Sequence, residues 1–261
     1  MKYGFIGCGN MGGAIARALS KATPDIFLSD PSDRTAAFAE ELGCSYGDNI
    51  TAAECCDRLF LAVKPQIMEK ALSPIAPVLR ERKPLIITIA AGIAISRIQE
   101  IIGAPLPIIR IMPNTPVMLG KGMILYCRNE LVTDEMLDSF LDDMRYAGIL
   151  DNIPEHLIDA GSAVSGCGPA YMYMFIEAMA DGAVACGIPR DKAITYAAAT
   201  MAGAAEMVLQ TGTHPGALKD AVCSPGGSTI AGVKALEEKG FRGAVMDCVS
   251  AAYTRTKELG K

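Results

Sequence analysis

The stretch Tyr3-Gly4-Phe5-Ile6-Gly7-Cys8-Gly9-Asn10-Met11-Gly12 decides the fold of the first part of this chain. A short apolar run predicts a strand, the pattern G-x-G-x-x-G follows it, and residues 13–19 continue with apolar side chains at helical spacing. In this context Gly7 allows a tight turn, Gly9 lets the backbone approach a pyrophosphate, and Gly12 lets helix and strand pack closely. The stretch predicts a dinucleotide-binding βα unit, with an ordinary βα turn as the alternative.

Strands and helices alternate after this unit. Apolar runs predict strands at residues 26–30, 59–63, 85–90, 108–112, 123–127 and 148–153, and helical patterns predict helices at residues 35–42, 66–80 and 96–102. Continuously apolar strands are typical of a parallel sheet that helices cover on both faces. The pattern predicts an α/β fold in which residues 1–153 form a Rossmann-type, doubly wound sheet that binds NAD(P).

Beyond Ile153 only helical patterns remain. Residues 170–186 are apolar nearly all round, residues 189–210 are rich in alanine, and residues 243–259 form the expected last helix. Because a helix that is apolar on every side must be buried, we expect a second subunit to cover it. The sequence predicts that residues 154–261 form an all-helical dimerisation and substrate-binding domain, in a homodimer or a larger oligomer built from dimers.

The composition argues against several classes of protein. The net charge is −5 and no Lys/Arg cluster is present, so we expect no nucleic acid partner. No signal peptide opens the chain, and no apolar run approaches the roughly 20 residues of a membrane span, so we expect no membrane partner. The 9 cysteines are scattered without C-x-x-C, which indicates a reducing, cytoplasmic location. No residues have metal-ligand spacing, so we expect no metal.

The expected cofactor site lies where the strands end, because ligands of doubly wound sheets bind outside the carboxyl ends of the strands. Asp30 stands near the place of the acidic residue that meets the ribose of NAD, although it can also be a turn residue. Ser32 and Arg34 can instead hold a 2′-phosphate, so we expect NADP, with NADPH preferred and NAD possible. The expected cofactor-binding residues are Ile6, Gly7, Cys8, Gly9, Asn10, Met11, Gly12, Asp30, Ser32, Arg34, Asn49, Ala62, Val63, Lys64, Pro65, Ala90, Ala91 and Asn114.

A second informative stretch is Ser224-Pro225-Gly226-Gly227-Ser228-Thr229, called the 224–229 loop below. Its proline and glycines break regular structure, and Ser228 and Thr229 stand where a helix N-cap is expected. A helical pattern follows and stops at Gly240. A helix start with free backbone N–H groups and two hydroxyls suits a carboxylate or phosphate, with an ordinary capped loop as the alternative.

These motifs resemble those of pyrroline-5-carboxylate reductases. The resemblance rests on Ser165-Gly166-Cys167-Gly168-Pro169-Ala170-Tyr171 and on Val222-Cys223 with the 224–229 loop; residues 62–65, 112–116 and 214–216 agree in order and spacing. It implies an NAD(P)H-dependent oxidoreductase that reduces a cyclic imine, its small-molecule substrate 1-pyrroline-5-carboxylate, to L-proline in the last step of proline biosynthesis. Cys167 replaces a serine of the family and Ser228 a commoner threonine, and both remain small.

The resemblance also implies the substrate site. The substrate-binding residues are expected to be Ser165, Ser224, Gly226, Gly227, Ser228 and Thr229. Thr229 and Ser228 are the expected catalytic residues, because an imine that binds already protonated needs only a weak donor. Glu177 and Asp181 can attract the iminium or can simply be solvated helix charges.

Two other functions compete with this one. A β-hydroxyacid dehydrogenase shares the two-domain layout but uses a lysine on the first long helix of its second domain, and residues 170–186 contain none. A non-catalytic dinucleotide-binding regulator is the other alternative, although it should have lost the 224–229 loop.

Overall fold

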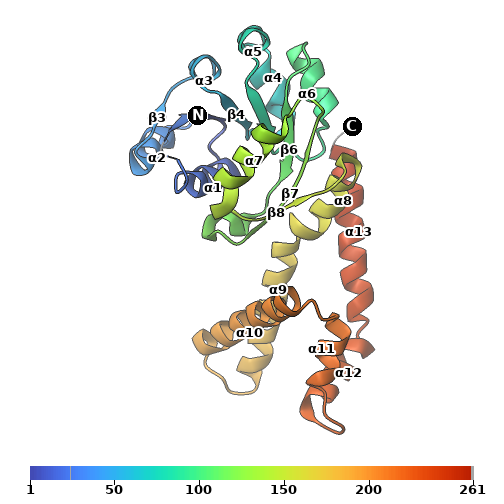
Figure 1. Cartoon of the computed structure of the whole chain (residues 1–261). Coiled ribbons are helices and arrows are strands. Elements are labelled where there is room, and N and C mark those ends of the chain that lie inside the picture. The colour runs from blue at the N-terminus through green and yellow to red at the C-terminus, as the bar shows by residue number, and fades with distance from the viewer. Residues whose placement is uncertain (24, 260–261) are drawn as a thin grey trace. The chain divides into compact units, whose positions relative to one another are not determined.

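A computed structural model describes residues 1–23 and 25–259, which form two compact units (Figure 1). The first unit contains Met1–Cys167 and the end of the chain from Ala252, and the second contains Gly168–Ala251. The boundary expected at residue 153 marks the place where strands give way to helices, whereas the compact units divide after Cys167. As a domain boundary, residue 153 stays a prediction.

The first unit is built on one sheet of 8 strands in the order β3-β2-β1-β4-β5-β6-β7-β8. Neighbouring strands from β3 to β6 are parallel, β7 is antiparallel to β6, and β8 is parallel to β7. The predicted doubly wound α/β fold is confirmed, and the strand order reverses between β1 and β4. The strands are β1 (Tyr3–Ile6), β2 (Ile26–Ser29), β3 (Ser45–Tyr46), β4 (Arg58–Leu61), β5 (Leu85–Thr88), β6 (Ile108–Met112), β7 (Gly122–Arg128) and β8 (Gly148–Asn152).

Helices cover this sheet (Figure 1). They are α1 (Asn10–Leu19), α2 (Arg34–Leu42), α3 (Asn49–Cys55), η1 (Pro65–Ile67), α4 (Met68–Leu72), α5 (Ala76–Arg82), α6 (Ile95–Ile102), η2 (Thr115–Leu119), α7 (Asp134–Asp143), η3 (Met144–Tyr146) and α8 (Glu155–Ser165). The single helix predicted at residues 66–80 is wrong: it is broken between Leu72 and Ala76, because Pro74 has no N–H to donate and clashes with a preceding helical turn. The sequence patterns also missed β3 and α3, which are short.

Among the described residues, the first unit buries two arginines, Arg58 and Arg110. Phe5 and Phe60 stack with ring centroids 4.5 Å apart, on neighbouring strands. Beside them Arg58 is only 2% exposed, and it pairs with Asp143 at 3.0 Å and donates to the Ser139 hydroxyl at 2.8 Å. Because a buried charge is tolerated only when it is paired, these contacts hold α7 against β4.

The second unit is helical throughout, as predicted. It contains α9 (Gly168–Ala185), α10 (Arg190–Thr211), α11 (Pro215–Ala221), α12 (Ser228–Glu238) and most of α13 (Phe241–Leu259). In the single chain α9 leaves large apolar side chains uncovered, including Tyr173 at 59% and Met174 at 69% exposure. Among residues 1–23 and 25–259, no helix combines the length and the apolar character needed to span a bilayer.

Candidate functional site

The glycine-rich loop between β1 and α1 has the geometry expected of its sequence. Gly7 has φ +98°, a left-handed conformation that side chains disfavour. A Cβ atom on Gly12 would overlap the carbonyl oxygen of Gly7 and lie 2.9 Å from the Cβ of Ala62. A Cβ on Gly9, in contrast, would meet no described atom within 4 Å. The loop is therefore tightly packed at Gly7 and Gly12. At Gly9 it is open, and a ligand can approach the backbone there.

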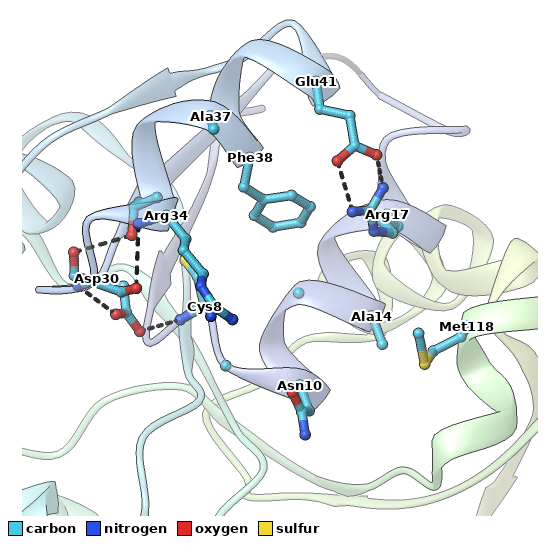
Figure 2. A pocket seen from close by; sticks show the side chains of 14 residues that line it. Cys8, Asn10, Ala14, Arg17, Asp30, Arg34, Ala37, Phe38, Glu41 and Met118 are labelled. Atoms are coloured by element: carbon cyan, nitrogen blue, oxygen red, sulfur yellow. Dashed lines mark hydrogen bonds and ion pairs between the residues drawn. The ribbon is translucent and has the colours of Figure 1, made fainter.

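Asp30, directly after β2, ties two loops together. Its carboxylate accepts hydrogen bonds from the backbone N–H of Cys8 at 2.7 Å and from that of Ser32 at 2.9 Å (Figure 2). The Ser32 hydroxyl in turn accepts from the N–H of Arg34 at 3.3 Å. Figure 2 shows the Arg34 side chain beside Cys8 and Asp30. Four residues of the predicted cofactor set thus form one connected cluster at the start of α2.

The Cys8 thiol stays uncharged in this cluster. Burial and, second to it, the nearby Asp30 carboxylate together raise the pKa of Cys8 to about 12. At neutral pH the loop therefore adds no thiolate charge to the place where a pyrophosphate would lie.

A cavity of about 560 Å³ lies between α1 and α2 and includes this cluster (Figure 2). At its other end Arg17 forms a bidentate ion pair with Glu41, and the guanidinium lies 4.7 Å from the centre of the Phe38 ring. Met118 of η2 also lines the cavity. The sequence reasoning missed these four residues, because no local motif shows which faces of two helices meet.

The other predicted cofactor residues follow neighbouring strands. Ala62, Val63 and Lys64 come directly after β4, and Pro65 opens η1. The backbone N–H of Ala62 donates to Ile6, at the end of β1, at 2.8 Å. The other residues of the set lie along the same edge. Ala90 and Ala91 follow β5, Asn114 follows β6, Asn49 begins α3, and Asn10, Met11 and Gly12 form the first turn of α1. The predicted residues therefore lie at the carboxyl edge of one sheet.

Asn114 and Ser165 meet at this edge. The Asn114 side chain is buried; its amide nitrogen donates to the carbonyl oxygen of Ser165 at 2.9 Å and its oxygen accepts from the N–H of Met123 at 2.9 Å. The side-chain amide thus joins the end of α8 to the end of β6. Ser165, expected at the substrate, is held beside residues expected at the cofactor.

The 224–229 loop in the second unit contains a β-turn. The carbonyl oxygen of Ser224 accepts from the N–H of Gly227 at 3.0 Å, and Gly226 has φ +71°. Proline is common at the second position of a type II turn, and the positive φ at its third position favours glycine. The predicted N-cap is wrong: Gly227 is the N-cap of α12, and Ser228 is its first residue, because the turn ends one residue earlier than expected.

The start of α12 is open. Gly227 has no side chain to cap the helix, so the N–H groups of the first turn lack the partner that a serine cap would supply. Ser224, Ser228 and Thr229 are exposed there.

Glu177 lies on α9, where the nearby Asp181 pairs with Arg190 at 2.5 Å. Within the described part of the chain, no group of three His, Cys, Asp or Glu side chains could hold a metal ion.

Comparison with known proteins agrees with this arrangement. Residues 155–259 match the family model described as pyrroline-5-carboxylate reductase dimerisation, and residues 2–92 match the model described as NADP oxidoreductase coenzyme F420-dependent. The chain is 44% identical to pyrroline-5-carboxylate reductase of Escherichia coli strain K12, over 100% of this chain and 98% of that protein. The chain belongs to the pyrroline-5-carboxylate reductase family. The predicted family and enzyme class, an oxidoreductase, are thereby confirmed.

Further relatives support the family across distant organisms. The reductase of Synechocystis is 41% identical over 100% of this chain and 99% of its own length. The crystal structure of Plasmodium falciparum pyrroline carboxylate reductase with NADP bound superposes with a TM-score of 0.91 at 34% identity, covering 100% of this chain and 98% of that one. Family membership argues against the two alternatives, the β-hydroxyacid dehydrogenase and the non-catalytic regulator.

Proposed function

We propose that this chain reduces 1-pyrroline-5-carboxylate to L-proline with hydride from NADPH, as the last step of proline biosynthesis. The observation that carries the proposal is the open start of α12 behind the Ser224–Gly227 turn, in a chain whose first unit presents an open glycine loop. The first feature suits a small carboxylate and the second a dinucleotide, and this reaction needs both.

The substrate carboxylate is the group that the start of α12 fits. The N–H groups of the first turn carry the positive end of the helix dipole, and the hydroxyls of Ser228 and Thr229 add two donors. The turn brings Ser224 against Gly227: a Cβ on Gly227 would overlap the Ser224 hydroxyl and lie 3.1 Å from the Ser224 carbonyl oxygen. Ser224, Gly226 and Gly227 therefore shape the site, and Ser228 and Thr229 contact the substrate.

The chemical step needs little acid catalysis from the protein. The bound nicotinamide supplies the hydride. A protonated imine accepts hydride without a strong acid, so a hydroxyl donor on the imine nitrogen is sufficient, and we assign that role to Thr229. Ser165, held by Asn114 at the sheet edge, orients the substrate toward the cofactor.

The preferred cofactor in this proposal is NADPH. Both carboxylate oxygens of Asp30 already accept backbone hydrogen bonds, so the carboxylate is less available to the two ribose hydroxyls of NADH. Arg34 supplies a cation, and Ser32 a hydroxyl, at the start of α2, where the helix dipole also favours a phosphate. The remaining residues of the predicted set contact the rest of the dinucleotide through the sheet edge.

The active assembly in this proposal is a homodimer or an oligomer built from dimers, in the cytoplasm. Exposed apolar patches as large as that of α9 are rare on stable monomers, and the matching family model is described as dimerisation. The 9 free cysteines fit a reducing compartment.

A direct assay tests the reaction. Purified protein is mixed with 1-pyrroline-5-carboxylate and either NADPH or NADH, and loss of absorbance at 340 nm is followed while proline is measured. We expect proline to form in proportion to the cofactor consumed, faster with NADPH at low cofactor concentration. Absence of turnover with both cofactors, in protein that still binds them, would refute the proposal. Light scattering after size exclusion tests the assembly, and a monomer would contradict it.

A further inference from the structure

A second cavity, of about 760 Å³, adjoins the cavity of Figure 2. Asp30, Ser32 and Thr35 line both, so the two cavities meet around the loop between β2 and α2. The second cavity extends to the connection between β3 and α3 and to the turn before α5. It is lined there by Tyr46, Ile50, Pro74 and Ile75. None of these four residues belongs to the predicted cofactor set.

Tyr46 is the aromatic residue of this cavity wall and its ring is open to solvent, at 57% exposure. Its backbone is held firmly. Tyr46 pairs with Leu28 in the sheet, and the next residue, Gly47, donates its N–H to the carbonyl oxygen of Leu28 at 3.0 Å. A Cβ on Gly47 would lie 2.8 Å from the ring of Phe27, so a larger residue there would force that ring to shift.

The residues after Gly47 extend this fixed segment. The Asp48 carboxylate accepts from the N–H of Thr51 at 2.8 Å and caps α3, and these hydrogen bonds lower the pKa of Asp48. The hydroxyl of Ser29 donates to the side-chain oxygen of Asn49 at 2.7 Å, which leaves the Asn49 NH₂ group as the donor facing the cavity. The wall therefore combines an aromatic ring on a held backbone, apolar side chains and one amide donor.

That combination matches a purine. A purine has two flat apolar faces, which stack on aromatic rings, and ring nitrogens at its edge that accept hydrogen bonds. We infer that Tyr46 is the stacking surface for the adenine ring of the dinucleotide and makes this chain depend on the base for cofactor affinity. The inference rests on the proposed function, because it takes a dinucleotide along the sheet edge as given. Ser32 lines both cavities and Arg34 lines the first, so a base in the second cavity would have its ribose 2′ position beside these two residues.

Calorimetric binding of three fragments tests the inference without turnover. The probes are adenosine 2′,5′-bisphosphate, ADP and reduced nicotinamide mononucleotide, which has no adenine. For Tyr46→Ala we expect the Kd of both adenine probes to rise by the same factor, about 5- to 30-fold, and the Kd of the nicotinamide probe to stay unchanged. Tyr46→Phe keeps the ring and should bind all three probes like the wild type. Tyr146→Ala, which removes another partly exposed tyrosine outside both cavities, is the matched control.

The outcomes separate this inference from the proposed function. Unchanged adenine-probe affinity in Tyr46→Ala, or an equal loss in Tyr46→Phe, overturns the stacking role. A loss shared by the nicotinamide probe also overturns it, because the variant then disturbs the whole site. If Tyr46→Ala melts at a lower temperature than the wild type, Tyr46→Thr, which removes the ring but keeps a high strand propensity, replaces it in the same comparison. Failure of the wild type to bind either adenine probe refutes the proposed cofactor instead.

Discussion

Single alanine substitutions in the glycine-rich loop should separate cofactor binding from stability. Gly9→Ala places a methyl group where no described atom lies within 4 Å, and the φ of −63° suits alanine. The cost to stability is limited to the N-cap position, where alanine is less favourable than glycine by about 1 kcal/mol. For a chain of this size we expect the melting temperature to fall by about 2–4 °C.

The cost of Gly9→Ala to binding is larger. The methyl group occupies the space in which a pyrophosphate must approach the backbone. Losing one hydrogen bond to a charged group costs about 1.5–3 kcal/mol, which raises the Kd of NADPH by roughly 10- to 100-fold. Gly12→Ala should instead cost more in stability than in NADPH binding. Its methyl group overlaps the Gly7 carbonyl, at a cost of about 3 kcal/mol against a gain of about 1 kcal/mol in helix propensity, so the melting temperature should fall by about 4–8 °C.

Gly13→Ala is the matched control on the same helix. A Cβ there would lie 3.4 Å from the Cys8 carbonyl oxygen and 3.5 Å from Phe38, which is ordinary contact, so both melting temperature and Kd should stay near or slightly better than wild type. Differential scanning calorimetry and fluorescence titration with NADPH give the two quantities. A Kd for Gly9→Ala within twofold of wild type would refute the placement of the pyrophosphate over Gly9. A melting temperature for Gly12→Ala equal to that of Gly13→Ala would refute the packing argument.

Three further substitutions test the site. Thr229→Ala should lower kcat by about 100-fold with little change in the Kd of NADPH, whereas Thr229→Ser retains the hydroxyl and most of the rate; a wild-type rate in the alanine variant removes Thr229 from the mechanism. Arg34→Ala should raise the KM of NADPH about tenfold more than that of NADH, and equal effects would mean that Arg34 does not contact the 2′-phosphate. Because the Cys8 pKa rises on folding from its ordinary value of 9.0 to about 12, the stability that the neutral buried thiol contributes is complete below that ordinary value. It is lost as the pH rises toward 12, by up to about 1.4 kcal/mol per pH unit. Urea unfolding at pH 8 and pH 10.5 should therefore show a smaller alkaline loss of stability in Cys8→Ala than in the wild type, and parallel losses would contradict the shift.

Local conformation was readable from the sequence wherever one residue type dictates the backbone. Gly7 predicted the turn before α1, and Pro225 with Gly226 predicted the break before α12, because few other residues adopt those dihedral angles. Continuously apolar runs that alternate with helical patterns predicted the doubly wound sheet, because a strand buried on both faces needs apolar side chains at every position. The family motifs added the prediction that Ser165 and the 224–229 loop bind the substrate.

Tertiary structure alone decided which polar groups are already engaged. Asp30 could be named as a ribose ligand from its position, but only folding shows that its carboxylate accepts the N–H of Cys8, 22 residues earlier in the chain. Asn114 likewise reaches Ser165 only through the packing of α8 on the sheet. Tyr46 was absent from the expected site because its two-residue strand has no periodicity, and the sheet alone brings it to the cavity. Hydrogen-bond partners and cavity walls come from residues distant in sequence, whereas turns and strands depend on neighbouring residues. The sequence therefore determined the scaffold, and the tertiary structure determined which side chains remain free to bind.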